Sequence, residues 1–227
     1  MHELVRTSTS FAECANGLWY CQVPSSANVT ANSHVMPLEH RRRLLDAMSH
    51  TVAIKGYADT TIADLAAEAR VSRRTFYEHF DDKAQCLIAL YDAASAQALE
   101  VLRSAIDPKR DWHDQVEAAL GAYLATLAGN PKLLRTLFIE ILGLGAPGLS
   151  ARRRANRQIA RFIVDVVDGP GAKPPRAQPL GDALALGIVG AINELVLQAI
   201  EEDRVERLAE LTPIAARLAR SVIDGVA

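Results

Sequence analysis

The sequence predicts an all-α protein, in which a small N-terminal three-helix unit is followed by a larger helical domain. Alanine and leucine dominate a composition that is 49% hydrophobic but only 5% aromatic, and both residues favour helix over sheet. Apolar residues recur at spacings of three and four along most of the chain, which is typical of amphipathic helices. The alternation of apolar and polar residues that marks a half-buried strand does not occur. With 227 residues the chain is long enough to bury a packed core.

Residues 1–36 differ from the rest of the chain. They are rich in Ser, Thr, Asn and Ala, and Trp19 and Tyr20 lack apolar partners at helical spacing. This composition is typical of a disordered tail. Alternatively Met36 is the natural first residue, because the patterned sequence begins directly after it. The intact mass of the native protein decides between these interpretations, since a mass that includes the first residue excludes the later start.

Residues 38–55 predict the first helix. Leu44, Leu45, Met48 and Val52 recur at helical spacing. Gly56 follows as a suitable C-terminal cap.

Residues 60–83, with the sequence TTIADLAAEARVSRRTFYEHFDDK, are spaced as two short helices joined by a tight turn. Thr61 can act as the N-cap of the first helix, and Asp64 three positions later completes a capping box. Ser72 offers the same kind of cap to the second helix, which turns Phe76 inward. The three helices from residue 37 to residue 83 are therefore expected to form one helix-turn-helix unit.

This stretch resembles the DNA-binding domain of TetR-type bacterial transcriptional regulators, and the resemblance runs from residue 38 to residue 90. It involves many constrained positions in one window, which makes it far more specific than a lone short motif. The positions are Gly56-Tyr57, Thr60-Thr61-Ile62, Asp64-Leu65-Ala66, Ala69, Val71-Ser72, Phe76-Tyr77, His79-Phe80 and Lys83. One residue departs from the pattern: Arg70 stands where the family usually has Gly, at a turn position that favours positive φ. A non-Gly residue there costs about 1 kcal/mol, and we interpret Arg70 as a solvated side chain rather than a phosphate contact.

The resemblance implies that the second helix enters the major groove and presents its N-terminal side chains to base edges. Arg73, Arg74 and Thr75 occupy that end of the helix. Other residues of the unit are similar to the family's contacts with the DNA backbone, and the two caps lie at helix ends suited to phosphate. The predicted DNA-binding residues are Thr61, Ser72, Arg73, Arg74, Thr75, Tyr77, His79 and Lys83.

The charge of the chain gives no general signature of nucleic-acid binding. The net charge is −2, and residues 38–83 hold eight basic and eight acidic residues. This balance counts mildly against DNA binding, because neutralisation of phosphates supplies much of the affinity. Arg73, Arg74 and Lys83 nevertheless cluster around the second helix, so we expect DNA binding that is sensitive to salt.

Residues 84–227 predict a larger helical domain for effector binding and dimerisation. Its helical patterns cover residues 83–107, 111–127, 132–142, 149–167, 180–201 and 205–223. Prolines and glycines at residues 168–179 predict a loop. Residues 180–201 are apolar on almost every side, which predicts burial all round.

A single helix-turn-helix unit buries too little surface for tight specific binding, so such units normally work as two-fold dimers on palindromic sites. TetR-like proteins dimerise through their last two long helices, and the resemblance implies the same here. Small residues in the first of these helices would let a partner backbone approach closely. The predicted interface residues are Gly187, Gly190, Ala191, Leu195 and Leu218. The alternative is that residues 180–201 form a core helix of the monomer.

Regulators of this kind hold an effector pocket in the larger domain, and the ligand changes the spacing of the two DNA-reading units. The candidate lining residues are aromatic residues and polar residues inside apolar helices, each of which needs a partner, solvent or a ligand when buried. These candidates are Trp112, Tyr123, Phe138, Glu140, Asn193 and Glu194, with Phe162 as a further aromatic. Ordinary core packing is the alternative for the aromatics. A mostly apolar lining favours a hydrophobic small molecule.

Enzyme activity is not expected, because the chain lacks a Ser/His/Asp order, an HExxH motif, a phosphate-binding Gly-rich loop and a CxxC pair. Neither the six histidines nor Cys14, Cys21 and Cys86 have metal-ligand spacing, so no cofactor or metal is predicted. We expect a soluble cytoplasmic protein, since no secretory signal is predicted and no apolar run approaches the roughly 20 residues that span a membrane. The sequence thus predicts a homodimeric repressor that binds a palindromic operator and is released by a small molecule. The alternative is a dimer of the same fold that binds small molecules or proteins and has lost specific DNA binding.

Overall fold

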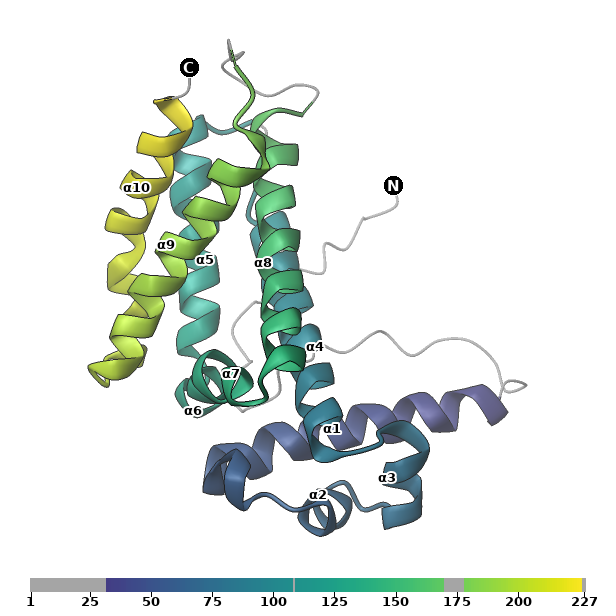
Figure 1. Cartoon of the computed structure of the whole chain (residues 1–227). Coiled ribbons are helices and arrows are strands. Elements are labelled where there is room, and N and C mark those ends of the chain that lie inside the picture. Colours follow the sequence, from purple (N-terminus) through teal and green to yellow (C-terminus); the bar gives the residue numbers. More distant parts are fainter. Residues whose placement is uncertain (1–31, 108, 170–177, 226–227) are drawn as a thin grey trace, which may run out of the picture. The chain divides into compact units, whose positions relative to one another are not determined.

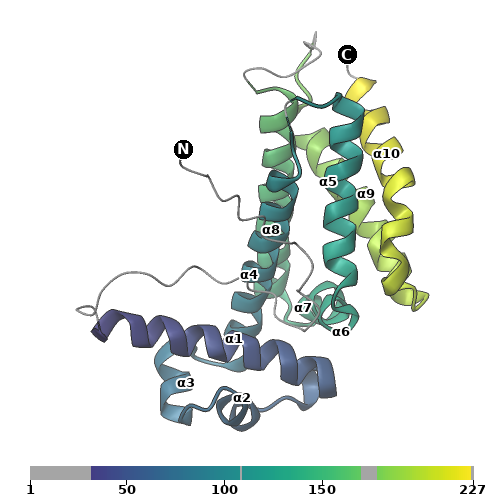
Figure 2. The ribbon, with the colours of Figure 1, turned by 180° about the vertical axis from the view of Figure 1, so that it is seen from behind.

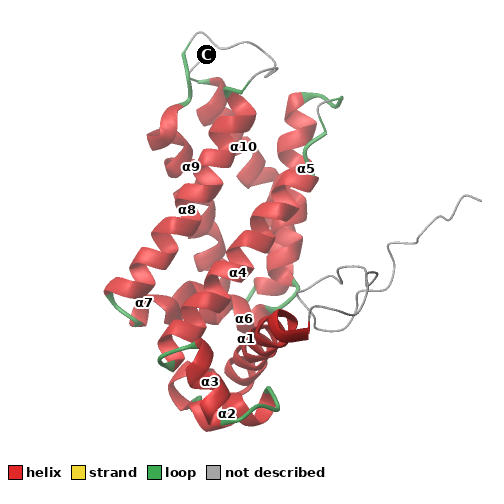
Figure 3. Ribbon diagram, turned by 90° about the vertical axis from the view of Figure 1, so that its right-hand side faces the viewer, coloured by secondary structure: helices red, strands yellow, loops and turns green. Residues whose placement is uncertain are grey.

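The computed structural model describes residues 32–107, 109–169 and 178–225, and these residues are helical without any strand (Figures 1 and 3). The helices are α1 (Asn32–Asp59), α2 (Ile62–Glu68), α3 (Arg73–His79), α4 (Lys83–Ser104), α5 (Trp112–Ala128), α6 (Pro131–Arg135), η1 (Thr136–Glu140), α7 (Ile141–Gly143), α8 (Ala146–Val167), α9 (Gly181–Glu201), η2 (Val205–Leu211) and α10 (Thr212–Asp224). The predicted all-α fold is confirmed. The expectations for residues 1–31 and for most of the loop at 168–179 lie outside the described residues.

The first three helices and the start of α4 pack around a small core. Helix α1 contacts α2, α3 and α4, and the side chains that are fully buried there are Leu44, Met48, Leu65, Phe76 and Leu87. Helix α1 begins at Asn32, earlier than the predicted start at residue 38. It is broken at Gly56, which has a φ of 81°.

The predicted caps fix the ends of the short helices. Thr61 Oγ1 accepts a hydrogen bond from the backbone N–H of Asp64, and the Asp64 carboxylate accepts one from the N–H of Thr61, so the capping box is complete. Ser72 Oγ accepts from the N–H of Thr75 at 3.0 Å, and Asp82 caps α4 in the same way. Each cap satisfies a backbone donor that the helix itself leaves unpaired.

The larger helical region is a bundle of α4, α5, α8, α9 and α10 (Figure 2). Leu124 of α5, Ile188 and Val196 of α9 and Ala216 of α10 lie in its buried core. Helices α6 and α7 and the segment η1 lie at the end of the bundle nearest α1, and α6 and η1 contact α1. The described residues belong to one compact unit. The predicted boundary between residues 83 and 84 stays a prediction.

The segment expected as one regular helix at residues 132–142 contains a π-helical turn, η1. Thr136 is buried there, and its hydroxyl donates a hydrogen bond to the carbonyl oxygen of Lys132 at 3.2 Å. A π-helical turn holds one more residue than an α-helical turn and is often found at functional sites.

Helix α9 is not buried on all sides, so that prediction is wrong for the single chain. Ala185, Ile188 and Ile192 face the core, whereas the side chains of Leu184 and Leu186 are 42% and 41% exposed. By length and composition α9 is also apolar enough to cross a membrane, which corrects the expectation that no run is long enough. Its core-facing side packs against α8 and α10.

Candidate DNA-binding surface and effector pocket

Helix α3 presents the side chains expected to read DNA. Phe76 is fully buried, which anchors one face of the helix to α1 and α2, while Arg73 and Arg74 are exposed at its N-terminal end. Arg73 makes no hydrogen bond or ion pair with any described residue, and Arg74 Nε donates to Glu78 Oε1 at 3.3 Å. Tyr77 is 50% exposed on the same helix. The buried face is thus fixed by packing, and the arginines remain accessible to a partner.

The turn between α2 and α3 has the positive φ that is expected where Arg70 stands in place of the family's usual Gly. Arg70 has a φ of 53°, in the left-handed region that favours Gly. The Arg43 guanidinium on α1 donates hydrogen bonds to the carbonyl oxygens of Ala69 and Arg70, the second at 2.8 Å. These bonds satisfy carbonyls at the end of α2 and tie the turn to α1. Periodicity alone gave no sign of this role for Arg43.

Replacing Arg70 with Gly is expected to raise the free energy of unfolding by about 1 kcal/mol, because Gly adopts positive φ without a steric penalty. Urea denaturation measures the change. Asp203, the other described non-Gly residue with positive φ, provides the comparison. Asp203→Gly should gain less, because Asp tolerates this conformation better than Arg. An unchanged or lower stability for Arg70→Gly would show that the Arg70 side chain makes a stabilising contact.

Thr61 and Lys83 are held by internal hydrogen bonds near the end of α1. Lys55 Nζ lies 2.5 Å from Asp64 Oδ2, and this bond, followed by those from Thr61, holds the pKa of Asp64 well below its usual value. The Lys83 ammonium donates to the carbonyl oxygens of Tyr57, Ala58 and Thr60 at 3.0–3.1 Å. All three of its protons are thereby used, so Lys83 joins α4 to the end of α1 irrespective of any DNA contact.

His79, in the last turn of α3, is only half-buried and lies edge-on to His40 of α1, with ring centroids 6.3 Å apart. Burial lowers the pKa of His79, and the nearby His40 lowers it further. A lowered pKa keeps the imidazole neutral at physiological pH. In the protein alone, His79 therefore has a neutral imidazole, which can still donate one hydrogen bond.

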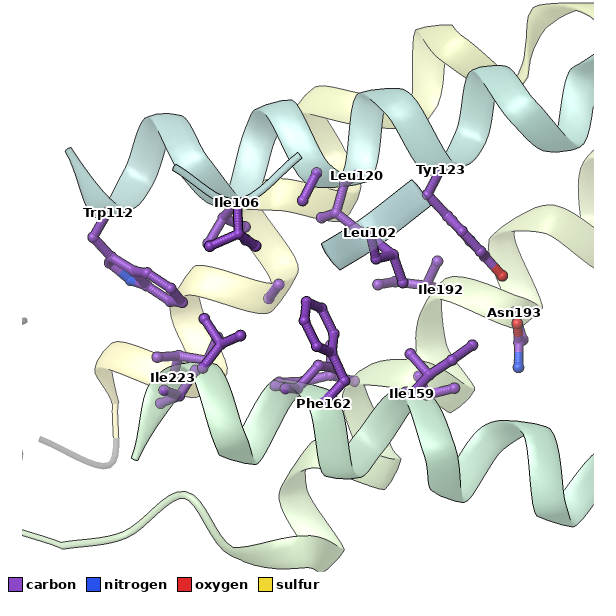
Figure 4. Close-up of a pocket in the computed structure, with 18 residues that line it drawn as sticks. Leu102, Ile106, Trp112, Leu120, Tyr123, Ile159, Phe162, Ile192, Asn193 and Ile223 are labelled. Carbon is purple, nitrogen blue, oxygen red and sulfur yellow. The ribbon is translucent and has the colours of Figure 1, made fainter. Parts of the chain in front are cut away.

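An apolar cavity of about 80 Å³ lies inside the bundle, between α4, α5, α8, α9 and α10 (Figure 4). Of the predicted lining residues, Trp112, Tyr123 and Asn193 line it, as does Phe162, whose ring points into its centre. No Asp, Glu, Lys, Arg or His is among the described residues that line it. The sequence did not single out its aliphatic lining, such as Leu102, Ile159 and Ile192, because aliphatic residues at helical spacing look the same in a lining as in a core.

Three of the predicted pocket residues do not line this cavity. Phe138 packs against the core without lining the cavity. Glu194 is exposed on the surface of α9 and reaches solvent. Glu140, in η1, accepts a hydrogen bond from the backbone N–H of Tyr57 at 2.8 Å. Polar residues in apolar helices were correctly expected to need a partner or solvent, but helical spacing does not tell which of these each one finds.

The bond from Tyr57 to Glu140 connects the helix-turn-helix unit to the larger helical region. Gly56 interrupts α1, so the N–H of Tyr57 needs an acceptor outside the helix, and the half-buried Glu140 carboxylate supplies it. Phe138, two residues earlier in η1, packs against the cluster of core residues that includes the cavity lining. The segment η1 therefore contacts the core on one side and the end of α1 on the other.

Replacing Glu140 with Ala is expected to lower the free energy of unfolding by about 1–3 kcal/mol, because a partly buried N–H loses a charged acceptor. Hydrogen exchange at the Tyr57 amide, followed by mass spectrometry, should become faster. Glu140→Gln keeps a carbonyl acceptor, so its exchange rate should lie between those of the unsubstituted protein and Glu140→Ala. Equal exchange rates in all three proteins would show that the bond does not hold α1 in solution.

A groove of about 430 Å³ lies outside the cavity, between α4 and α8. Leu99 and Arg103 line it from α4, and Gln158, Arg161 and Phe162 line it from α8. Phe162 also lines the inner cavity. Phe162 therefore contributes to the lining of both the cavity and the surface groove.

The face of α9 that carries the predicted interface residues is open. Gly187 and Gly190 are exposed, and a Cβ atom added at either would meet no atom within 4 Å. Ala191, Leu195 and, on α10, Leu218 are half-buried. The exposed large side chains Leu184, Leu186 and Ile214 extend the apolar surface on α9 and α10.

Comparisons with known proteins match both the motif and the fold. Residues 44–90 match the family described as "Bacterial regulatory proteins, tetR family". The "Fatty acid metabolism regulator protein" of Bacillus subtilis is 23% identical over 175 residues, which cover 75% of this chain and 88% of the relative.

Solved structures share the fold at low sequence identity. The fatty acid degradation regulator FadR of Bacillus halodurans has a TM-score of 0.65 at 20% identity, covering 79% of this chain and 93% of that one. FadR of Bacillus subtilis, solved in complex with stearoyl-CoA, has a TM-score of 0.61 at 19% identity, covering 82% and 99%. The matched family, the residues that carry the helix-turn-helix and the shared fold agree with one another. The chain belongs to the TetR family of bacterial regulatory proteins and is a DNA-binding transcriptional regulator.

Proposed function

We propose that this chain is a cytoplasmic homodimeric repressor, which binds a palindromic operator and is released when a largely apolar small molecule enters the cavity. Residues 37–83 would form the DNA-binding domain, and residues 84–227 the effector and dimerisation domain. The observation that carries the proposal is the exposed N-terminal end of α3, held in place by the buried Phe76 and the Ser72 cap. Repression rather than activation rests on the resemblance to the family.

For DNA contact, α3 has the size of a recognition helix. Arg73 and Arg74 are expected to reach base edges in the major groove, where Arg pairs bidentately with guanine. Thr75 and Tyr77 would contact bases or backbone beside them. Thr61 lies at the N-terminus of α2, where the helix dipole favours a phosphate.

For dimerisation, the open face of α9 and α10 supplies an apolar surface with little steric bulk. Gly187 and Gly190 would allow the two α9 helices to approach closely, and Leu184, Leu195 and Leu218 would be covered by the partner. Two copies of α9 and α10 would then form a four-helix bundle. Burial of this surface removes the exposed leucines of the single chain from water.

For effector binding, the cavity offers an apolar lining with few polar groups, as small-molecule sites do. Its volume of about 80 Å³ is smaller than the roughly 150 Å³ of an engineered cavity that holds benzene. A longer molecule therefore requires Phe162 to move, which would join the cavity to the groove between α4 and α8. The stearoyl-CoA in the solved FadR of Bacillus subtilis supports a ligand with an apolar chain.

Selection of bound sequences from a random pool of double-stranded DNA tests the proposed function. We expect enrichment of a palindrome whose half-sites lie about one helical turn apart, which reports both DNA binding and the two-fold dimer. Enrichment of a single half-site would contradict the dimer. No enrichment even at low salt would contradict operator binding and favour the alternative of a fold that has lost it.

A further inference from the structure

We propose that Tyr123 and Asn193 form the hydrogen-bonding end of the cavity, and that the ligand is an apolar molecule with a neutral carbonyl group that binds there. This inference rests on the proposed function, because it specifies the chemistry of the effector for the same cavity.

The Tyr123 hydroxyl is a buried polar group without a partner among the described residues. Tyr123 is only 7% exposed, and its hydroxyl makes no hydrogen bond with any residue that the structure describes. Burial raises the pKa of Tyr123, and the neighbouring Tyr91 raises it further, so the phenol keeps its proton and can donate it. A buried hydroxyl without a partner lowers stability, so one that persists in a native structure requires an explanation.

Asn193 lies at the same end of the cavity as that hydroxyl. Figure 4 shows Tyr123 pointing toward Asn193, with Trp112 at the opposite end. Asn193 is 6% exposed, and its Nδ2 donates to Asn156 Oδ1 at 3.1 Å. This bond fixes the amide and leaves Asn193 Oδ1 and the second N–H available. The Tyr123 hydroxyl and the Asn193 amide therefore lie together at one end of a mostly apolar lining, and the Trp112 indole lies at the other.

The chemistry of this end selects one class of ligand. A carbonyl oxygen would accept the hydrogen bond of Tyr123, whereas an alkane would leave the hydroxyl unpaired. A carboxylate would be buried against a lining without any cationic residue, which costs far more than burying a neutral group. Ketones, esters, thioesters and amides meet these conditions.

Titration with three probes of equal chain length tests the proposal: octane, 2-octanone and octanoate. The fluorescence of Trp112, in a Trp19→Phe background, reports entry into the cavity. We expect the unsubstituted cavity to bind 2-octanone more tightly than the other two. Tyr123→Phe should weaken 2-octanone binding by about two- to tenfold, the range of one net hydrogen bond, and leave octane binding unchanged.

The same variant gives a readout that does not depend on a ligand. Tyr123→Phe removes an unpaired buried hydroxyl, so its melting temperature without ligand should rise by about 2–4 °C. Tyr91→Phe is the matched control, because it removes a neighbouring phenol hydroxyl that does not line the cavity. That control should bind 2-octanone as before and should not raise the melting temperature.

Two results would overturn the proposal: a lower melting temperature for Tyr123→Phe, or failure of the unsubstituted protein to prefer 2-octanone. The DNA selection described above is made without any ligand. A palindrome found there, together with either of these results, would support the DNA-binding function and contradict only the proposed carbonyl site.

Discussion

Arg73→Ala is expected to lower affinity for the selected operator at least thirtyfold while leaving the fold intact. A bidentate contact between Arg and guanine contributes roughly 1–3 kcal/mol of discrimination, and a two-fold dimer would lose one contact in each half-site. The Arg73 side chain is exposed and has no partner among the described residues, so its removal leaves no buried group unpaired. Fluorescence anisotropy with the operator and with a scrambled duplex measures the two affinities.

Two matched variants separate base reading from simple attraction to phosphate. Arg73→Lys keeps the charge but not the bidentate geometry, so it should lose specificity while largely keeping affinity for the scrambled duplex. Arg153→Ala removes an exposed arginine from α8 instead and should change neither affinity. If Arg73→Ala lowers the affinity for the operator and for the scrambled duplex equally, Arg73 contacts the DNA backbone rather than a base. A lower melting temperature would show that its side chain stabilises the fold.

Gly190→Arg is expected to convert the dimer to monomers and to abolish tight operator binding. The proposed interface brings two α9 helices together at this position, so each protomer would bury a bulky cation without a partner. Breaking an interface with an unpaired buried charge costs several kcal/mol, which corresponds to a loss of more than a hundredfold in dimer affinity. Sedimentation equilibrium measures the assembly state over a range of protein concentrations.

The control for this variant is Gly143→Arg, the same substitution at an exposed glycine of α7. A side chain at Gly143 or at Gly190 meets no atom within 4 Å in the single chain, so neither arginine should strain the monomer. Gly143→Arg should therefore stay dimeric. A dimer that survives Gly190→Arg would place the interface on another surface of the bundle.

The proposed signal from ligand to DNA would pass through the segment η1. Phe138 packs against the core that surrounds the cavity, and Glu140 accepts the N–H of Tyr57 at the end of α1. A ligand that displaces the cavity lining would also displace η1, because Phe138 of η1 packs against the same core. The helix-turn-helix unit is attached to its other side, so the two sites have a physical connection in which a coupling free energy can arise.

Local rules in the sequence were enough to predict the fold class and the local structure of the helix-turn-helix unit. The caps Thr61 and Ser72, the break at Gly56 and the strained turn at Arg70 all depend on residues within a few positions of one another. Capping and backbone preferences act over this short range, so these features can be recognised in the sequence. The inward orientation of Phe76 follows in the same way from helical spacing.

Contacts between distant segments could not be predicted, because helical spacing gives the direction of a side chain but not what it meets. Lys83 reaches three carbonyls near the end of α1, and Glu140 reaches Tyr57 from a segment 83 positions away. Glu194 and Asn193 are neighbours in sequence, yet one lies in solvent and the other in the cavity.

The sequence by itself determined the helices, their caps, the exposed arginines of α3 and the family to which the chain belongs. Those features arise from short-range hydrogen bonding and periodicity, which neighbouring residues encode directly. The tertiary structure decided that α9 has one open face, that Phe162 lines both the cavity and the surface groove, and that Tyr123 is buried without a partner among the described residues. Those features depend on how closely five helices pack and where they leave space, and that is a property of the assembled bundle rather than of any one segment.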